Sequence, residues 1–414
     1  MTAEHTAALL RTTTAVRERA RWLTQRARQG GSAWFTVHED GMQAAAQAAV
    51  DATRQRYPQL NIPYHSRWRH FEAGGIDRKA QFDALLGEVS PTVRAHAMID
   101  LTVTSVLLDA GAGADWKYVE AASGQTFTRS EGLGVASFHA FNAGLFSSDP
   151  KRPRQADAQG LRGLVADRLA EAFQVGPSNP LVGLEGRVVL LRRLGEALAA
   201  QPEVFGDEVQ RPGGLFDMLV TPLGPGEAPR TADIAAHDIL SQLLMSLSGI
   251  WPSGSYLGNV PLGDCWRHEA VPGEDGTAGW VPFHKLSQWL TYSLLEPFEW
   301  AGVQVRGLDA LTALPEYRNG GLLLDSGWLR LKDPSVAQKV WQPGDEPIVE
   351  WRALTVALLD ELALTVQEQL DMDASALPLA CVLEGGTWAA GRVYAQRLRG
   401  GLPPLQVASD GTVF

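Results

Sequence analysis

The spacing of apolar residues constrains the fold most, because it follows the period of helices over most of the chain and the alternation of strands almost nowhere. Thr6–Arg28 is rich in Ala, Leu and Arg, contains no Gly or Pro, and is stopped by Gly30-Gly31. Further helices are expected over Asp40–Gln55, Arg78–Leu86, Pro91–Leu108, residues 151–174 and 185–200, Ala232–Leu247, Pro282–Leu295 and Trp351–Leu370. Only Trp34–His38 alternates like a strand. The pattern predicts a mainly α, multi-helical globular protein with a few short strands and no doubly wound sheet.

The length of the chain fits one globular unit. Its 414 residues, 45% of them hydrophobic, are enough to bury the core of one large domain or of two lobes. Residues 206–231 are rich in Gly and Pro, and are the best candidate for a junction between lobes 1–205 and 232–414. We find no internal repeat. A single unit over 1–414 with these two lobes is therefore expected.

Charge and composition exclude several classes of partner. The formal net charge is −11, whereas a protein that binds a polyanion is usually basic, so nucleic acid is not an expected partner. No apolar run approaches the roughly 18 residues that cross a membrane, and the first residues lack a secretory pattern. Cys265 and Cys381 are too few for a disulfide framework. We expect a cytoplasmic protein with no membrane partner, and the sequence does not indicate an oligomeric state.

The segment Leu107–Gly113 resembles the nucleotide-binding turn of Rossmann-like methyltransferases, in which an apolar strand ends in an acid and a glycine turn. Here the preceding residues continue a helical pattern from Pro91, so a helix that ends in a glycine cap is the alternative. Asp109 and Trp116 are polar and aromatic residues beside flexible backbone. Both therefore stay candidates for substrate binding.

The irregular stretch Ile62–Gly75 contains two histidines and two arginines. His65 and His70 lack the spacing of a metal-binding pair on a helix, and no metal is expected. The stretch is either a partly structural loop or a substrate-binding loop. Farther along, Glu131 either pairs with Arg129 or contributes to substrate binding.

The segment Leu308–Gly321 contains the most specific arrangement of acids. Asp309 and Glu316 are seven residues apart, which places them on one face if they share a helix. Pro315 is expected to break the helix just before Glu316, so that the two acids converge across a bend. Cleavage of a glycosidic bond uses such a pair, one acid near the cationic sugar and one group that manages protons. The alternative is a helix-terminal surface with ordinary salt bridges.

Two basic residues and one aromatic residue accompany these acids. Lys285 and Arg318 could hold an anionic group, and Arg is suited to bidentate contact with phosphate. Tyr317 is expected to pack on the sugar. With Glu316 and Asp309 as the catalytic pair, this chemistry requires no metal and no other cofactor.

Four stretches resemble a bacterial and fungal family long known only as a domain of unknown function and tied to the uracil catabolism (URC) pathway. They are Ile62–Arg78, Ser105–Tyr118, Arg129–Pro150 and Gly385–Arg392, and the resemblance covers nearly the whole chain. Some members carry the label uracil phosphoribosyltransferase. The loop that binds phosphoribosyl pyrophosphate, an apolar strand followed by paired acids, is not found in this sequence.

The stretch from His284-Lys285 to Arg318 is similar to the queuosine salvage proteins, which are helical ribohydrolases. Those proteins carry a Lys on a helix, an Asp three residues before a Thr, and then Phe-Ala-Asp-Tyr-Arg. Here Asp309 precedes Thr312 by three residues, and Leu314–Arg318 takes the place of the last motif, with Glu instead of Asp. The resemblance implies a multi-helical N-glycosidase architecture and the same type of reaction.

Together the two resemblances imply a small-molecule riboside as substrate. The URC pathway opens the pyrimidine ring on ribose phosphate and leaves a ribosylurea species, from which urea must be split. We therefore expect an N-ribosyl hydrolase that acts on ribosylurea or its 5′-phosphate. The alternatives are a uracil phosphoribosyltransferase-like activity, a non-catalytic partner of a pathway enzyme and, more remotely, a methyltransferase.

Calorimetric titration with S-adenosylmethionine tests the methyltransferase alternative. A protein whose residues 107–113 end a helix offers no strand-to-turn site for that cofactor, and we expect no heat of binding. Binding in the micromolar range would instead favour the methyltransferase.

Overall fold

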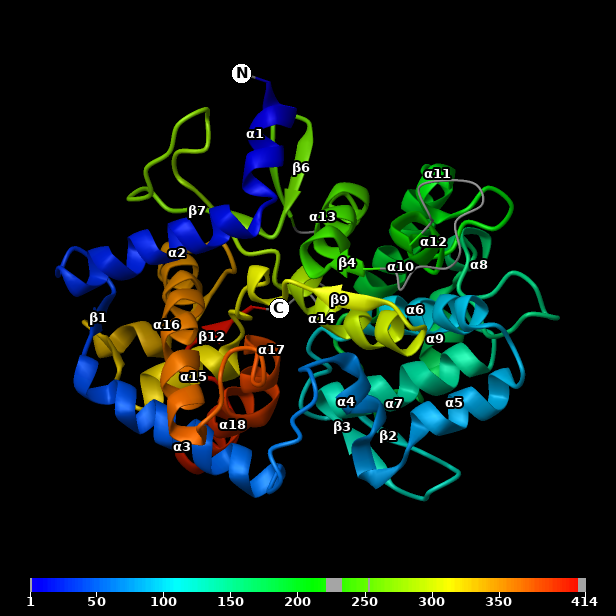
Figure 1. The fold of residues 1–414 in the computed structure, drawn as a ribbon, viewed down its shortest axis with the longest axis horizontal. Coiled ribbons are helices and arrows are strands. Elements are labelled where there is room, and N and C mark those ends of the chain that lie inside the picture. The colour runs from blue at the N-terminus through cyan, green and yellow to red at the C-terminus, as the bar shows by residue number, and fades with distance from the viewer. Residues whose placement is uncertain (1, 221–232, 252–253, 409–414) are drawn as a thin grey trace. The chain divides into compact units, whose positions relative to one another are not determined.

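The computed structural model describes residues 2–220, 233–251 and 254–408. Helices dominate these residues, and each sheet that they form has two strands (Figure 1). The predicted mainly α class is therefore confirmed. No helix among the described residues is long and apolar enough to cross a membrane.

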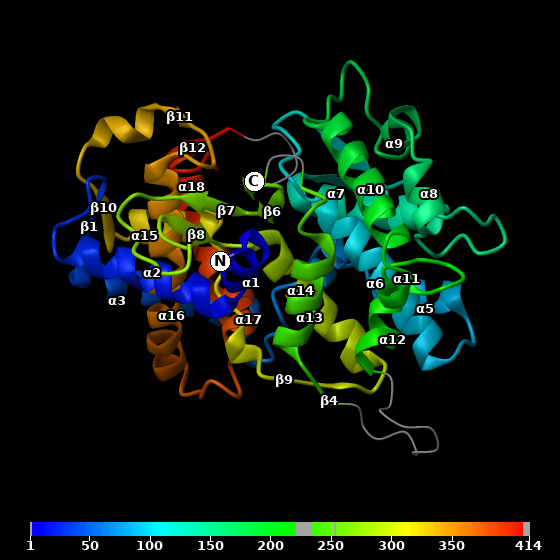
Figure 2. The same ribbon diagram turned by 90° about the horizontal axis from the view of Figure 1, so that it is seen from above.

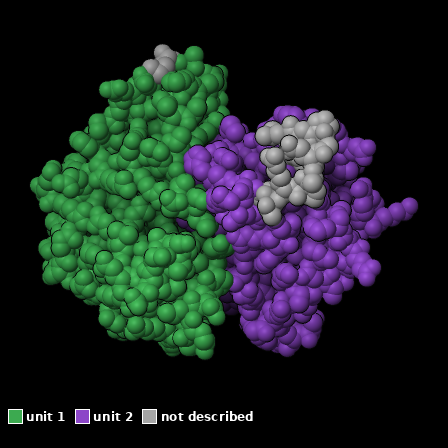
Figure 3. Space-filling model, in the orientation of Figure 1, with its two compact units in different colours: residues 1–65, 254–288, 307–408 green, residues 66–253, 289–306, 409–414 purple. Residues whose placement is uncertain are grey.

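The chain divides into two compact units (Figure 3). Unit 1 comprises residues 1–65, 254–288 and 307–408, and unit 2 comprises residues 66–253, 289–306 and 409–414. The units thus divide the chain at other places than the predicted lobes 1–205 and 232–414. Of the predicted junction, residues 206–220 belong to unit 2, and residues 221–231 lie outside the described residues.

The helix α16 (Glu346–Leu370) is the central element of unit 1, and it packs against α2 (Thr13–Arg28) and α3 (Met42–Arg56) (Figures 1 and 2). The other helical elements of this unit are α1 (Ala3–Leu10), η1 (Glu39–Gly41), η3 (Leu308–Ala310), α15 (Tyr317–Asp325), η4 (Pro334–Gln338), α17 (Leu379–Val382), η5 (Leu383–Thr387) and α18 (Trp388–Arg399). Its strands pair as β1 (Phe35–Val37) with β10 (Leu329–Leu331), β5 (Ser255–Leu257) with β6 (Val260–Gly263), β7 (Cys265–Arg267) with β8 (Trp280–Pro282), and β11 (Val340–Trp341) with β12 (Gln406–Val407). Only the last pair is parallel.

Unit 2 is built around α6 (Pro91–Leu107), whose residues are buried from Ala95 almost continuously to its end. Its other helical elements are α4 (Arg67–Phe71), η2 (Ala73–Gly75), α5 (Arg78–Leu86), α7 (Arg129–Asn142), α8 (Ala158–Arg162), α9 (Ala166–Ala172), α10 (Leu184–Ala199), α11 (Pro202–Phe205), α12 (Gly214–Val220) and α13 (Ala236–Leu247). The strand β2 (Lys117–Val119) pairs with β3 (Thr126–Thr128), and β4 (Asp233–Ala235) pairs in parallel with β9 (Gln304–Arg306). The helix α14 (Lys285–Trp300) begins in unit 1, and residues 289–300 belong to unit 2.

Several predicted helices differ from the observed ones. The predicted helix Thr6–Arg28 is divided after Leu10, because Thr12 caps α2 and accepts a hydrogen bond from the backbone N–H of Ala15. The helices predicted from Ala232 and Pro282 begin at Ala236 and Lys285. Instead of one helix over residues 151–174, α8 and α9 follow an extended stretch, because Asp157 caps α8 and accepts hydrogen bonds from the backbone N–H groups of Ser148 and Gly160. Helix α16 starts five residues before the predicted Trp351. Pro347 stands in its first turn, where proline costs no hydrogen bond.

Each unit contains a buried arginine held by two parallel hydrogen bonds to a carboxylate. In unit 1, Arg352 donates to both oxygens of Asp264 at 2.7 Å. In unit 2, Arg78 donates to both oxygens of Glu120 at 2.9 and 2.8 Å. Burial raises the pKa of Glu120, but hydrogen bonds from Arg78, Ser123 and His139 outweigh it and lower that pKa to about 2.

The pair in unit 2 predicts a dependence of stability on pH. Because the pKa of Glu120 is about 2 in the folded protein and 4.5 in the reference state, its contribution is fully present above about pH 4.5 and is lost as the pH falls towards 2. Glu120→Gln should lower the free energy of unfolding at pH 7 by about 3–5 kcal/mol, since Arg78 stays buried without its partner. Urea unfolding at pH 7 and pH 3 should show this difference shrinking at the lower pH. The exposed Glu88→Gln is the control, and a difference independent of pH would contradict the assignment.

Candidate functional site

A turn of π-helix, η5, joins α17 to α18 in unit 1. Such turns are rare and occur mostly at functional sites, because the wider turn displaces side chains from the regular helical positions. Glycines let this turn lie directly against α3: a Cβ atom on Gly386 would stand 2.5 Å from the carbonyl oxygen of Ala49. The lack of a side chain at Gly386 therefore allows this turn to pack directly on α3.

The side chain of Glu384 in this turn is only 3% exposed and accepts three hydrogen bonds. Arg56 and Tyr57, at the end of α3, both donate to Oε1, the latter at 3.0 Å. The His65 Nδ1 atom lies 2.7 Å from Oε2. Burial raises the pKa of Glu384, but the hydrogen bond and charge of His65 and the charge of Arg56 outweigh it and hold the pKa below its usual value. The carboxylate is therefore ionised at neutral pH.

Trp388, the first residue of α18, carries the next part of the site. Its ring contacts that of His65 with the ring centroids 5.9 Å apart. The guanidinium carbon of Arg318 lies 4.1 Å from the centroid of the same indole, and Arg318 Nε donates to the Tyr317 hydroxyl at 3.0 Å. Arg318 is 5% exposed, and among the described residues it forms no ion pair with a carboxylate. A buried cation in this state is suited to an anionic ligand.

Glu316 precedes α15 and caps it. Its Oε2 accepts from the backbone N–H of Arg318 at 2.9 Å, and its Oε1 accepts from the backbone N–H of Asn319 at 2.6 Å. The Thr387 hydroxyl of η5 donates to the Asn319 side-chain oxygen at 2.8 Å, which connects the π turn to α15. The structure thus brings together the predicted residues Glu316, Tyr317 and Arg318 and adds the cluster around Glu384.

Asp309 lies in η3, which contacts α17, and its side chain is exposed. The prediction that Asp309 and Glu316 share a helix or a bend between helices is wrong, because residues 311–316 are not helical. Pro315 explains the difference, since it disfavours helical geometry at Leu314 before it. A catalytic role for Asp309 stays a prediction.

Lys285 is the first residue of α14, and its backbone N–H donates to Asp264 Oδ2 at 3.0 Å. Arg352 holds that carboxylate in the bidentate pair, and the combined effect of these donors keeps the pKa of Asp264 low although burial raises it. Lys285 is therefore anchored through its main chain, and its side chain is half-buried.

The other predicted residues belong to unit 2. Helix α6 ends at Leu107, so the predicted helix before this motif is confirmed, and the Rossmann-like turn has no strand before it. The predicted glycine cap is not observed, because the C-cap residue is Leu108, with a φ of −89°. Asp109 accepts from Arg67 Nη1 at 2.6 Å, and Glu131 on α7 acts on Arg67 through its charge. Trp116 is fully buried, and its indole N–H donates to the Phe173 carbonyl at 3.0 Å. Asp109 and Glu131 thus gather near Arg67, whereas Trp116 fills the core.

One group of three residues in the described part of unit 1 has the composition of a metal site. His268 Nε2 lies 2.9 Å from a Glu350 oxygen and 4.0 Å from a Glu346 oxygen. However, His268 Nδ1 accepts the backbone N–H of Ala270 at 3.2 Å, so the hydrogen sits on Nε2 and points at Glu350. The Arg26 Nη1 atom also lies near this carboxylate, 3.6 Å from Glu350 Oε2. This arrangement suits a hydrogen bond from a neutral imidazole to a carboxylate better than a divalent cation.

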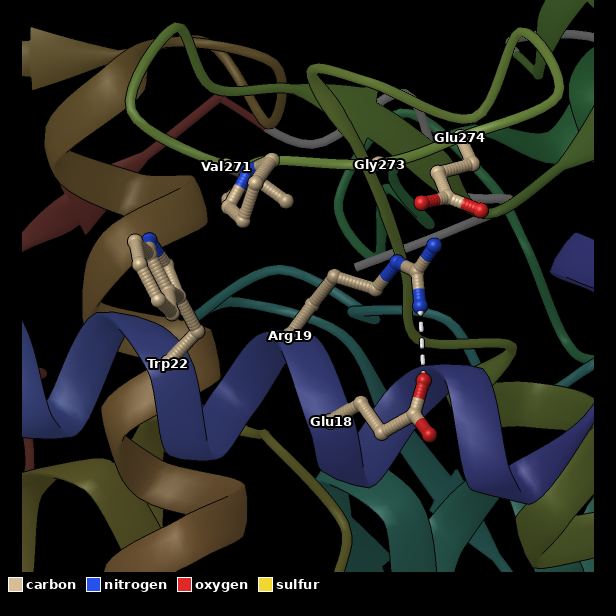
Figure 4. A pocket seen from close by; sticks show the side chains of 7 residues that line it. Glu18, Arg19, Trp22, Val271, Gly273 and Glu274 are labelled. Carbon is tan, nitrogen blue, oxygen red and sulfur yellow. Dashed lines mark hydrogen bonds and ion pairs between the residues drawn. The ribbon is translucent and has the colours of Figure 1, made fainter.

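A shallow pocket of about 470 Å³ lies on unit 1, and its lining residues do not include those around Glu384 and Arg318 (Figure 4). Glu18, Arg19 and Trp22 of α2 form one wall, and the loop from Val271 to Glu274 forms the other. Arg19 projects between Glu18 and Glu274, and it donates to Glu18 at 3.1 Å. The pocket includes none of the predicted site residues.

The sequence singled out the glycine-rich motif around residue 385 only for its resemblance, and Glu384, Arg56 and Tyr57 were missed. The available signal was Glu384 itself, a lone charged residue directly after the apolar run Leu379–Leu383 and directly before two glycines. A buried acid in such a position requires partners, but only the fold shows that α3 supplies them.

The close approach of η5 to α3 predicts an unusual effect of alanine. Glycine-to-alanine changes inside helices commonly stabilise, but Gly386→Ala places a methyl group against Ala49 O, and overpacking of this kind costs about 1–3 kcal/mol. Urea unfolding should show this loss. Gly176→Ala is the control, since its added Cβ meets no atom within 4 Å, and equal stability of both variants would refute the packing argument.

Comparison with known proteins places the chain in a family. The model of a family described as protein of unknown function (DUF1688) matches residues 9–414. The protein urg3 of Schizosaccharomyces pombe is 40% identical over 360 residues, which are 85% of this chain and 84% of that protein. Uracil catabolism protein 4 of Lachancea kluyveri is 39% identical over 381 residues, which are 86% of this chain and 85% of that protein. The chain therefore belongs to the DUF1688 family, and the predicted membership in a family tied to uracil catabolism is confirmed.

Proposed function

We propose that this protein is an N-ribosyl hydrolase of uracil catabolism, which splits ribosylurea or its 5′-phosphate into urea and ribose or ribose phosphate. The relative in Lachancea kluyveri is named for uracil catabolism, and it matches most of the chain, which supports the pathway. The reaction rests on the residues around Arg318 and on their similarity to the queuosine salvage motif.

One observation carries the proposal: a fixed carboxylate lies two residues from a buried arginine that has no carboxylate partner among the described residues. The backbone N–H groups of α15 orient Glu316, and the aromatic rings of Tyr317 and Trp388 hold the Arg318 guanidinium. An arginine so placed binds phosphate oxygens well, and it favours the 5′-phosphate as substrate.

The chemistry follows from charge development at the sugar. As the bond from C1′ to the urea nitrogen lengthens, C1′ and the ring oxygen acquire positive charge, which the carboxylate of Glu316 would stabilise. Tyr317 would pack on the ribose. Asp309 and Lys285 remain the proposed second acid and second anion-binding residue, with Asp109 and Glu131 as further candidates for substrate binding.

Urea release is the direct test of the reaction. Purified protein should release urea from ribosylurea 5′-phosphate, and more slowly from free ribosylurea, with no added pyrophosphate donor. Turnover that strictly requires phosphoribosyl pyrophosphate would favour a phosphoribosyltransferase. Turnover only in the presence of another pathway enzyme would favour a non-catalytic partner, and either result would refute the proposal.

Two variants test the residue roles. Glu316→Gln should lower kcat on the order of 10²–10³-fold, by analogy with the loss of one group that stabilises transition-state charge. The amide oxygen can still cap α15, so the cost in stability should stay within about 1 kcal/mol. Arg318→Met should raise KM for the phosphorylated substrate and change KM for the free riboside little.

Glu361→Gln serves as the matched control, because Glu361 pairs with Arg28 on α2 and not with any residue of the site. It should keep wild-type kinetics. If Glu316→Gln remains folded and turns over a verified substrate normally, Glu316 is not the carboxylate at the sugar.

A further inference from the structure

The hydrogen bond between His65 and Glu384 fixes the position of one proton. An ionised carboxylate only accepts hydrogen bonds, so the 2.7 Å contact at Oε2 requires a hydrogen on His65 Nδ1. In the neutral imidazole the other nitrogen, Nε2, then carries a lone pair. This ring is therefore set as a proton acceptor at Nε2 whenever it is neutral.

The surroundings keep Glu384 ionised and immobile. Arg56 donates to its Oε1 and to its carbonyl oxygen, and Tyr57 donates to Oε1 as well. The titratable side chains that contact this carboxylate among the described residues are Arg56, Tyr57 and His65. Their combined effect lowers the pKa of Glu384 although burial opposes it.

The pair belongs to the same cluster as Arg318. Trp388 contacts the His65 ring on one hand and the Arg318 guanidinium on the other, and it directly follows the π turn that carries Glu384. Two other histidine–glutamate pairs occur in the described residues, His139 with Glu120 and His268 with Glu350. In both pairs the carboxylate contacts Nε2, whereas in the pair of Glu384 and His65 it contacts Nδ1.

We propose that Glu384 and His65 form a carboxylate–histidine pair that handles the proton in the reaction of the Arg318 site. Glu384 is the positioning residue, and His65 is the general base. This inference rests on the proposed function, and it adds the group that activates water, which Glu316 does not supply.

The step balances in atoms and electrons. His65 Nε2 takes a proton from water while the water oxygen forms its bond to C1′. The electron pair of the C1′–N bond leaves with the urea nitrogen, which gains a proton from solvent. His65 then returns its proton to solvent, so the net change is water and ribosylurea to ribose and urea, with no oxidant or reductant.

Nitrogen-15 NMR of the histidine rings tests the geometry without any substrate. With the signal identified by its loss in His65→Gln, the His65 ring of the wild-type protein should show the Nδ1-protonated tautomer in its neutral form. A ring protonated at Nε2 would overturn the proposal. Because this measurement needs no turnover, it stands even if the protein releases no urea and the proposed function fails.

Kinetics test the role. His65→Gln and Glu384→Gln should each lower kcat by about 100-fold or more with little change in KM, as expected for loss of a general base. The double variant should be no slower than the slower single variant, because the two residues act as a unit. His139→Gln, from the pair in unit 2, is the control and should keep wild-type kcat. If the effects of the two single variants multiply in the double variant, the two residues do not act as a unit. If the variants raise KM and leave kcat unchanged, the pair has only a structural role.

Discussion

The compensation of buried charge is the constraint on which the rest of this structure depends. A carboxylate or a guanidinium that leaves water loses several kcal/mol unless partners replace the water. Asp264 meets this requirement with Arg352, Glu120 with Arg78, and Glu384 with Arg56 and His65. The residues of these pairs come from segments far apart in sequence, so the pairs also fix which segments pack together within each unit.

Arg318 stands out against this background. It is 5% exposed and lies beside the rings of Tyr317 and Trp388, but, unlike Arg352 and Arg78, it pairs with no carboxylate among the described residues. Stacking on Trp388 stabilises a guanidinium by about 0.5–2 kcal/mol, which is less than full pairing provides. An anion that binds would supply further stabilisation, and this is the physical reason why we propose that an anionic group of the substrate binds beside Arg318.

Sequence reasoning predicted the helical class because the 3.6-residue period is a local property, and the buried residues of α2 and α10 follow this period. It failed where a proline interrupts that period and where the partners of a buried residue lie far away in the sequence. The acids Asp309 and Glu316 were assigned to one helical face, but Pro315 keeps the intervening residues extended. Glu384 was missed because its partners Arg56 and Tyr57 are more than 300 residues away, and neither the π turn nor its contact with α3 leaves a periodic trace in the sequence.

The capping role of Glu316 and its proposed role at the sugar are compatible. A carboxylate has about four lone-pair sites, and the two backbone donors of α15 occupy only part of them. One of those donors is the N–H of Arg318 itself. The carboxylate is therefore held at the helical turn that carries Arg318, a rise of about 5.4 Å, and the rings of Tyr317 and Trp388 hold the guanidinium. The Thr387–Asn319 hydrogen bond ties the π turn to the same helical start, so Glu384 acquires its position relative to Arg318 from the same rigid element.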